Sequence, residues 1–280
     1  MILLKIRKKS SLSGMIRYDM AQGIWKNIGW FLPVVYFTFA FFAKTRQMLA
    51  LPFAPPVDKM GLTDLVFSFF AGMETYHPGP GQMFDPPIQW LLVFFYLSFL
   101  ISFYPAADMK KYGRNLMIHV KSREVYWYSK CLWVFATTMV YYGLILLLMA
   151  IFLLMTGNYS PGFHKDTGAF LAGVIVGPET GAEICFFILV TPFLVMLSLA
   201  LFQNLLSFVL SPVYGFLVNI GLVICSAFFN TSLCVGQIAM FKRSFILGGS
   251  VGWPHLVIPI LLSVLSILAG GMYFKRKDIL

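Results

Sequence analysis

The sequence predicts an all-α, polytopic membrane protein with six transmembrane helices. Of its 280 residues, 59% are hydrophobic and 11% are charged, whereas a soluble domain carries about 25% charged residues. The mean hydropathy is +0.80. The 21 Lys and Arg and 11 Asp and Glu residues are too few to cover a soluble protein of this length. The composition therefore excludes an ordinary globular enzyme.

Residues 1–27 are predicted to form a cytoplasmic or interfacial N-terminal segment. Between Ser10 and Lys26, apolar residues recur mostly at helical spacing. This pattern is typical of an amphipathic helix lying in the inner membrane interface. A solvated start to the first spanning helix is the alternative.

Six apolar stretches follow, each expected to cross the bilayer. They are Ile28–Ala43, Ile88–Tyr104, Cys131–Met155, Ile184–Phe202, Pro212–Phe229 and Pro254–Phe274. Their interiors contain no Asp, Glu, Lys, Arg or His except His255, close to the start of the last stretch. Ion-coupled transporters usually hold such groups at mid-membrane, so an energy source outside the bilayer is favoured.

The segments between the spans complete a single transmembrane domain, residues 1–280. Spans one and two (28–104) enclose an outer loop at 44–87, in which LTDLVFSFFAGM is expected to be a short helix on the outer leaflet. Spans three to six occupy 131–274, with a tight turn expected at Gln203–Ser211. Residues 230–253 are apolar enough to predict a re-entrant outer segment before the last span, an ordinary outer loop being the alternative.

The distribution of charge predicts that both termini are cytoplasmic. Six Lys or Arg residues lie in 1–27, six in 105–130 and three in the tail 275–280, whereas six are spread over all outer segments. This asymmetry follows the positive-inside rule. The net charge of +10 then reflects topology and contact with anionic lipids, and no nucleic-acid partner is expected.

The inner loop 105–130 is the strongest candidate for a contact with a soluble partner. It is too long for a tight turn and carries a helical pattern after Pro105. A basic loop that only sets topology is the alternative reading. The candidate contact residues are Asp108, Lys110, Lys111, Tyr112, Gly113, Arg114, Leu116, Arg123 and Glu124.

The predicted order of elements resembles the permease subunit of type V ABC exporters, a group related to the ABCA and ABCG transporters. The residues in comparable places are Asp108, Gly113, Leu116, Ser122, Arg123 and Lys130. Two departures are that a single Asp replaces the usual acidic pair and that no Pro precedes Ser122. The resemblance implies a coupling helix at about Asp108–Val120 that seats in an ATPase subunit.

The resemblance further implies a permease half, located in the plasma membrane, that works with two ABC ATPase subunits and a second permease half. The chain contains no phosphate-binding G-x-x-x-x-G-K-[ST] motif, so ATP and Mg²⁺ would belong to the partner subunit. We expect no catalytic site, cofactor or metal site in this chain. The expected activity is export of an apolar or amphiphilic peptide, lipid or drug, as in antimicrobial peptide resistance.

Two other interpretations remain open at this point. An immunity or sensor protein would bind its ligand at the outer loops without transport, and a lipid-modifying enzyme would need a polar cluster that the sequence does not indicate. Asn204 and Asn219 are expected to form hydrogen bonds between helices. Cys185 and Cys234 both lie towards the outer side and could pair.

Overall fold

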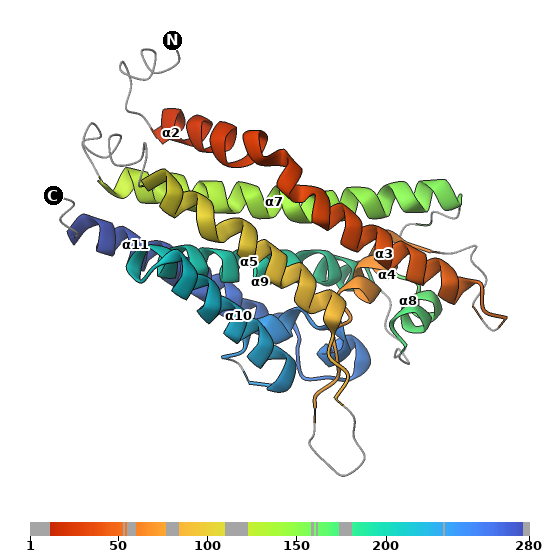
Figure 1. Ribbon diagram of the computed structural model, residues 1–280. Helices are drawn as coiled ribbons and strands as arrows, with labels where there is room; N and C mark the ends of the chain where they lie inside the picture. The colour runs from red at the N-terminus through yellow and green to blue at the C-terminus, as the bar shows by residue number, and fades with distance from the viewer. Residues whose placement is uncertain are drawn as a thin grey trace.

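The computed structural model describes residues 12–52, 54, 60–76, 84–109, 123–157, 160, 162–173, 181–231 and 233–276. This part of the chain is helical and contains no β-strand (Figure 1). The longer elements are α2 (Leu12–Asp19), α3 (Leu32–Leu49), α4 (Leu62–Phe69), α5 (Ile88–Asp108), α7 (Arg123–Thr156), α8 (Lys165–Ala172), α9 (Ala182–Val209), α10 (Pro212–Phe228) and α11 (Val257–Arg276). Short helical turns are η1 (Met20–Ile24), η2 (Trp25–Phe31), η4 (Val235–Ala239), η5 (Phe241–Arg243), η6 (Phe245–Leu247) and η7 (Trp253–Leu256).

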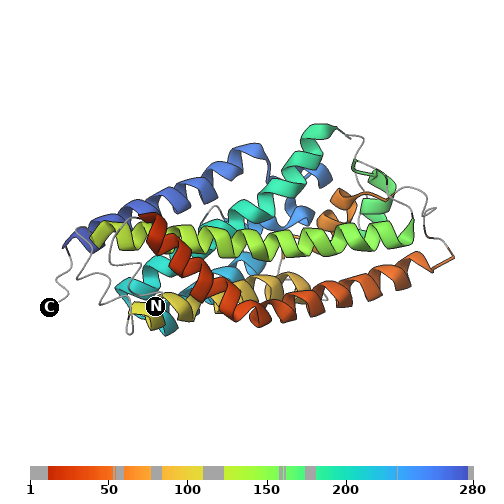
Figure 2. The same cartoon turned by 90° about the horizontal axis from the view of Figure 1, so that it is seen from above.

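The long helices form one elongated bundle, seen from two directions in Figures 1 and 2. At one end lie α2, the end of α5, the start of α7 and the end of α11; we call this the α2 end. The short helices α4 and α8 lie at the opposite end, here called the α8 end. α9 is central, because it packs against α5, α7, α10 and α11.

Within the described residues, five helical segments are long and apolar enough to cross a membrane. They are Leu12–Leu49, Ile88–Pro105, Glu124–Thr156, Ala182–Val209 and Trp253–Arg276. The remaining predicted span, the fifth at Pro212–Phe229, corresponds to α10, an apolar helix of 17 residues. α10 is about 25 Å long, shorter than a typical hydrocarbon core of about 30 Å. The structure thus supports a multi-pass membrane protein with five candidate spans.

Several helices extend beyond the predicted span boundaries. α7 begins at Arg123 rather than Cys131, and α5 continues through Pro105 to Asp108. The turn predicted at Gln203–Ser211 is shorter than expected, because α9 remains helical to Val209 and α10 begins at Pro212. Tertiary packing sustains these helical ends, although their polar residues lower the local hydropathy.

The helix expected in the outer loop is present, but its predicted position on the membrane surface is wrong. Leu65, Val66 and Phe67 of α4 are fully buried, and Phe67 stacks on Phe241 with ring centroids 5.4 Å apart. The polar side chains of α4 find partners within the protein, since Asp64 accepts from the Gly61 and His164 backbone and Ser68 donates to the Leu171 carbonyl, so the helix can be buried. α8, which the sequence did not predict, packs against α4.

Residues 235–247 form short helical turns enclosed by the bundle, and Arg243 secures them. Its guanidinium is buried and donates to the carbonyl oxygens of Met73, Glu74, Ser226, Ala227 and Phe229. Three of these acceptors lie at the end of α10, where unpaired carbonyls and the helix dipole favour a cation. Arg243 therefore ties this segment both to α10 and to the chain after α4.

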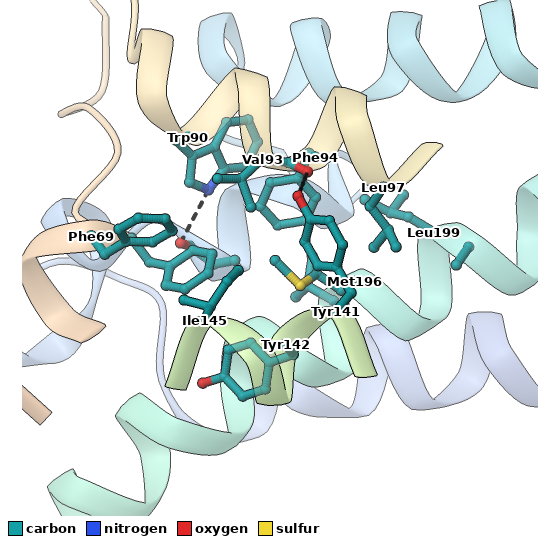
Figure 3. Close-up of a cluster of buried hydrophobic side chains, with 14 of the residues drawn as sticks. Phe69, Trp90, Val93, Phe94, Leu97, Tyr141, Tyr142, Ile145, Met196 and Leu199 are labelled. Atoms are coloured by element: carbon teal, nitrogen blue, oxygen red, sulfur yellow. Dashed lines mark hydrogen bonds between the residues drawn. The ribbon is translucent and has the colours of Figure 1, made fainter. Parts of the chain in front are cut away.

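The core between α5, α7 and α9 is aromatic and closely packed (Figure 3). The Tyr141 hydroxyl donates to the Val93 carbonyl at 2.8 Å, and the indole nitrogen of Trp90 donates to the Ala239 carbonyl at 3.3 Å. Each buried ring thus satisfies its polar atom. These contacts hold α5 against α7 and against the segment that precedes α11.

Candidate functional site: a buried ion cluster at the α2 end

Three charged side chains from three helices meet inside the α2 end of the bundle. The Nζ atom of Lys130, on α7, lies 2.5 Å from Oδ1 of Asp19 and 2.7 Å from Oδ2 of Asp108. Asp19 is the last residue of α2, and Asp108 is the last residue of α5. Asp19 is 2% exposed, Asp108 is 6% exposed and Lys130 is 1% exposed. We call them the ion cluster.

Hydroxyl groups complete the coordination of the two carboxylates. Ser129 donates to Oδ2 of Asp19 at 2.5 Å, and Tyr104 donates to Oδ1 at 2.9 Å. Tyr126 donates to Oδ2 of Asp108 at 3.2 Å. Buried charges are tolerated when they are paired and hydrogen-bonded in this way.

The ammonium group of Lys130 also lies between two aromatic rings. It is 4.9 Å from the ring centroid of Tyr104 and 4.9 Å from that of Tyr126. This distance allows attraction between a cation and the electron-rich ring faces. With two carboxylates and one ammonium ionised, the cluster carries a formal charge of −1. Without Lys130 the two carboxylates would repel each other with no cation between them, so the stability of the cluster depends on this lysine.

The local sequence explains how the three charges reach one place. Ser129 and Lys130 are adjacent on the early part of α7, and Tyr126 lies one helical turn before Lys130. Tyr104 lies one turn before Asp108 on α5. Directly after Asp19, the chain changes to the π-helical turn η1, and such turns are frequent at functional sites.

The structure separates the predicted contact residues into groups. Asp108 is buried in the ion cluster, and Arg123 is the first residue of α7. The Glu124 side chain is 37% exposed and lies 3.9 Å from Lys275. The others lie outside the described residues: Lys110, Lys111, Tyr112, Gly113, Arg114 and Leu116.

A second polar cluster lies between α5, α9 and α10. Asn219 donates to Oγ of Ser98 at 2.7 Å and to Oε1 of Gln203 at 2.8 Å. Gln203 in turn donates to the Ser98 carbonyl at 2.7 Å and to the Ser102 hydroxyl at 2.5 Å. Asn204 is also buried, but neither of its amide atoms has a partner among the described residues. These interhelical bonds join three helices.

Sequence reasoning missed the roles of Asp19 and Lys130. It assigned Asp19 to an amphipathic helix and Lys130 to a cytoplasmic loop, outside any span. Lys130 instead lies within the candidate span Glu124–Thr156, because α7 begins at Arg123, before the predicted start of that span at Cys131. The predicted range contains no charged residue, but the observed helix does. The available signal was that both residues border long apolar stretches, where a charge is costly unless it is paired.

At the α8 end, a further buried carboxylate connects α4 to the start of α8. Asp64 accepts hydrogen bonds from the backbone nitrogens of Gly61 and His164, both at 2.7 Å, and its Oδ2 lies 2.9 Å from Nδ1 of His164. Burial raises the pKa of the Asp64 carboxyl above its ordinary value, although these hydrogen bonds oppose that change.

The structure describes no group of three or more His, Cys, Asp or Glu side chains placed to hold a metal ion. All four cysteines are free thiols, including Cys185 and Cys234. No protein-family model and no curated protein matches the sequence. The described residues form a multi-pass helical membrane protein with a buried ion cluster at one end.

Proposed function

We propose that this chain is the permease subunit of an ABC transporter. In this proposal, the chain has six spans with α10 as the fifth, both termini are cytoplasmic, and α2 lies in the inner interface of the plasma membrane. Residues 230–253 form a re-entrant outer segment. A second permease half and two ATPase subunits complete the transporter, which exports an apolar or amphiphilic substrate.

The ion cluster is the observation that supports this proposal most directly. The connection between α5 and α7 spans residues 110–122, and the cluster joins its two flanking helices through Asp108 and Lys130. The same lysine binds Asp19 of α2. A movement imposed on the connection is therefore passed to three helices at once.

The expected strength of the cluster suits such a role. Removing one partner of a buried ion pair typically costs about 3–5 kcal/mol, so thermal motion seldom separates the three helices at this point. A soluble subunit docked on residues 110–122 would move α2, α5 and α7 together. Lys110, Lys111, Tyr112, Gly113, Arg114 and Leu116 are then proposed to contact the ATPase, with Arg123 and Glu124 at its edge.

Site-specific cross-linking tests the proposal. A photoreactive amino acid at Arg114 should capture an ATP-binding protein in membranes of the source cell, identified by mass spectrometry. The same group at Lys165, near the α8 end, is the control and should not capture it. Capture of no nucleotide-binding protein at Arg114 would contradict the proposed partner.

Alanine variants test the individual contacts. Arg114→Ala should weaken co-purification of the ATPase roughly 30-fold, because a central interface arginine contributes about 2 kcal/mol or more. Lys26→Ala removes an exposed positive charge from the same predicted side and should have no such effect. Equal loss in both variants would mean that the loop acts only through its charge.

The ligand-binding alternative predicts a different phenotype. An immunity or sensor protein would still protect cells against its ligand after deletion of the ATPase captured at Arg114. A transporter would lose that protection completely. Protection that persists without the ATPase would therefore overturn the permease assignment.

A further inference from the structure

The α8 end contains a cavity of about 540 Å³, lined by α3, α4, the start of α5, α8 and Lys242 of η5. Cavities of roughly 300–1,000 Å³ are typical of sites for small molecules. The ion cluster lies at the other end of the bundle, so this cavity is separate from the candidate site already described.

One wall of the cavity is apolar and aromatic. Along α3, lining residues recur at helical spacing from Tyr36 and Phe37 through Ala40 and Phe41. Trp90 of α5 also lines the cavity. Such a surface favours an apolar chain over a polar solute.

The cavity also has an opening on the apolar side of the bundle. Tyr36 and Ile88 line it and are 71% and 63% exposed. Both lie on helices that are long and apolar enough to span a membrane, so in a bilayer their exposed surfaces would face lipid. A molecule in the bilayer can therefore enter from the side.

Towards the end of α3, the lining changes from apolar to cationic. Lys44 is one turn beyond Ala40 on the same face, and Lys242 lines the cavity from η5. Neither lysine forms an ion pair with any described residue. Asp85 is the acidic residue in the lining, which leaves the cavity with one excess positive charge. The Gln89 amide nitrogen, in the same lining, has no partner within the described segments.

The backbone holds Lys242 in this position. Its amide nitrogen donates to the Ala71 carbonyl at 2.9 Å, and the preceding amide of Phe241 donates to the Phe70 carbonyl at 3.1 Å. These bonds attach η5 to the residues directly after α4. Lys44 is carried by α3 itself, so both cations are presented without a loop rearrangement.

We propose that this cavity binds an anionic phospholipid from the surrounding membrane. An acyl chain lies along the aromatic wall formed by α3 and α5, and the phosphate lies against Lys44 and Lys242. Lysine near a helix end places its ammonium at headgroup level while its stem stays in apolar surroundings. The order along α3, apolar and then cationic, matches the order of tail and headgroup in such a lipid.

Native mass spectrometry of the full chain tests this site. The protein is released from nanodiscs that hold equal amounts of phosphatidylglycerol and phosphatidylcholine, and retained lipids are counted. The wild-type protein should retain one phosphatidylglycerol in preference to phosphatidylcholine. The double variant Lys44→Gln/Lys242→Gln should lose roughly 30-fold in that preference, because each lysine near a membrane surface contributes about a fivefold effect.

Three further arms make the result decisive. The matched control Lys26→Gln/Lys165→Gln removes two lysines that do not line the cavity and should keep the preference. Ala40→Trp should fill the apolar part and reduce retention of both lipids, with unfolding temperature recorded to confirm folding. Soluble glycerol phosphate should not displace the lipid. Unchanged preference in the Lys44→Gln/Lys242→Gln variant, or displacement by glycerol phosphate alone, would overturn the proposal.

Discussion

Lys130 Nζ lies 2.5 Å from the carboxylate of Asp19, a residue 111 positions earlier in the chain. Because Lys130 also binds Asp108, one ammonium group neutralises part of the charge of two buried carboxylates. Neither carboxylate has another cationic partner among the described residues. Among the described residues, the charge balance of the contact between α2, α5 and α7 therefore depends on the single ammonium group of Lys130.

Replacement of Lys130 should destabilise the protein strongly. Lys130→Met leaves two carboxylates buried together without a cation, and we expect a loss of about 3–5 kcal/mol in the free energy of unfolding. Thermal unfolding in detergent measures the change. The control is Lys275→Met, since Lys275 is largely exposed and 3.9 Å from Glu124; its loss should be below about 1 kcal/mol. Similar unfolding temperatures for the two variants would refute the role given to Lys130.

Arg243 should be equally sensitive, although it has no carboxylate partner within the described part of the chain. Arg243→Gln would leave buried carbonyl oxygens at the end of α10 without donors, at a cost of about 3 kcal/mol. The adjacent variant Lys242→Gln changes a partly exposed side chain and should alter stability by less than about 0.5 kcal/mol. Chemical unfolding of the two variants compares them directly, and equal stabilities would show that the carbonyls find other donors.

Two helical glycines should respond in opposite directions to alanine. A Cβ atom on Gly270 would lie 2.2 Å from the Trp127 ring, so Gly270→Ala should cost about 1–3 kcal/mol. A Cβ atom on Gly221 would meet open space, and Gly221→Ala should stabilise α10 by about 0.5–1 kcal/mol. Thermal unfolding of both variants provides the measurement. A neutral Gly270→Ala variant would mean that α11 and α7 separate easily.

The carboxyl group of Asp64 should make stability depend on pH. Burial raises its pKa above 3.8 in the folded protein, so the folded state binds more protons than the unfolded chain just above that pH. Its contribution to stability therefore falls as the pH rises through this window. The measurement is the unfolding temperature of wild type minus that of Asp64→Asn. This difference should decrease as the pH is raised from about 4 to about 6. A rising difference would show that the hydrogen bonds of His164 and Gly61 outweigh burial.

Accessibility of introduced cysteines tests the proposed orientation. In a cysteine-free background, single cysteines at Lys121 and Lys277 should be shielded from an impermeant thiol reagent in intact cells, because the basic segments are expected to be cytoplasmic. A cysteine at Lys165 should be labelled. Labelling at Lys121 from outside would reverse the orientation and remove the basis for an ATPase contact there.

The sequence alone was enough to establish a multi-pass helical membrane protein. Hydropathy is a sum over neighbouring residues, so long apolar stretches can be recognised without knowing the tertiary structure. The predicted stretches Cys131–Met155 and Ile184–Phe202 accordingly lie within the observed helices α7 and α9. Helix ends were less predictable. Asp108 and Gln203 lower the local hydropathy, yet both remain helical because other helices supply their hydrogen-bond and ionic partners.

Only the tertiary structure decided what the charged residues contact. The partners of Lys130 lie 22 and 111 residues away along the chain, and no local pattern specifies such a pairing. The same holds for Lys44 and Lys242, which line one cavity although they come from α3 and η5. Composition and periodicity determine which segments are buried in lipid, whereas the partner of a buried charge depends on how separate helices pack, because electrostatic pairing requires proximity in space rather than in sequence.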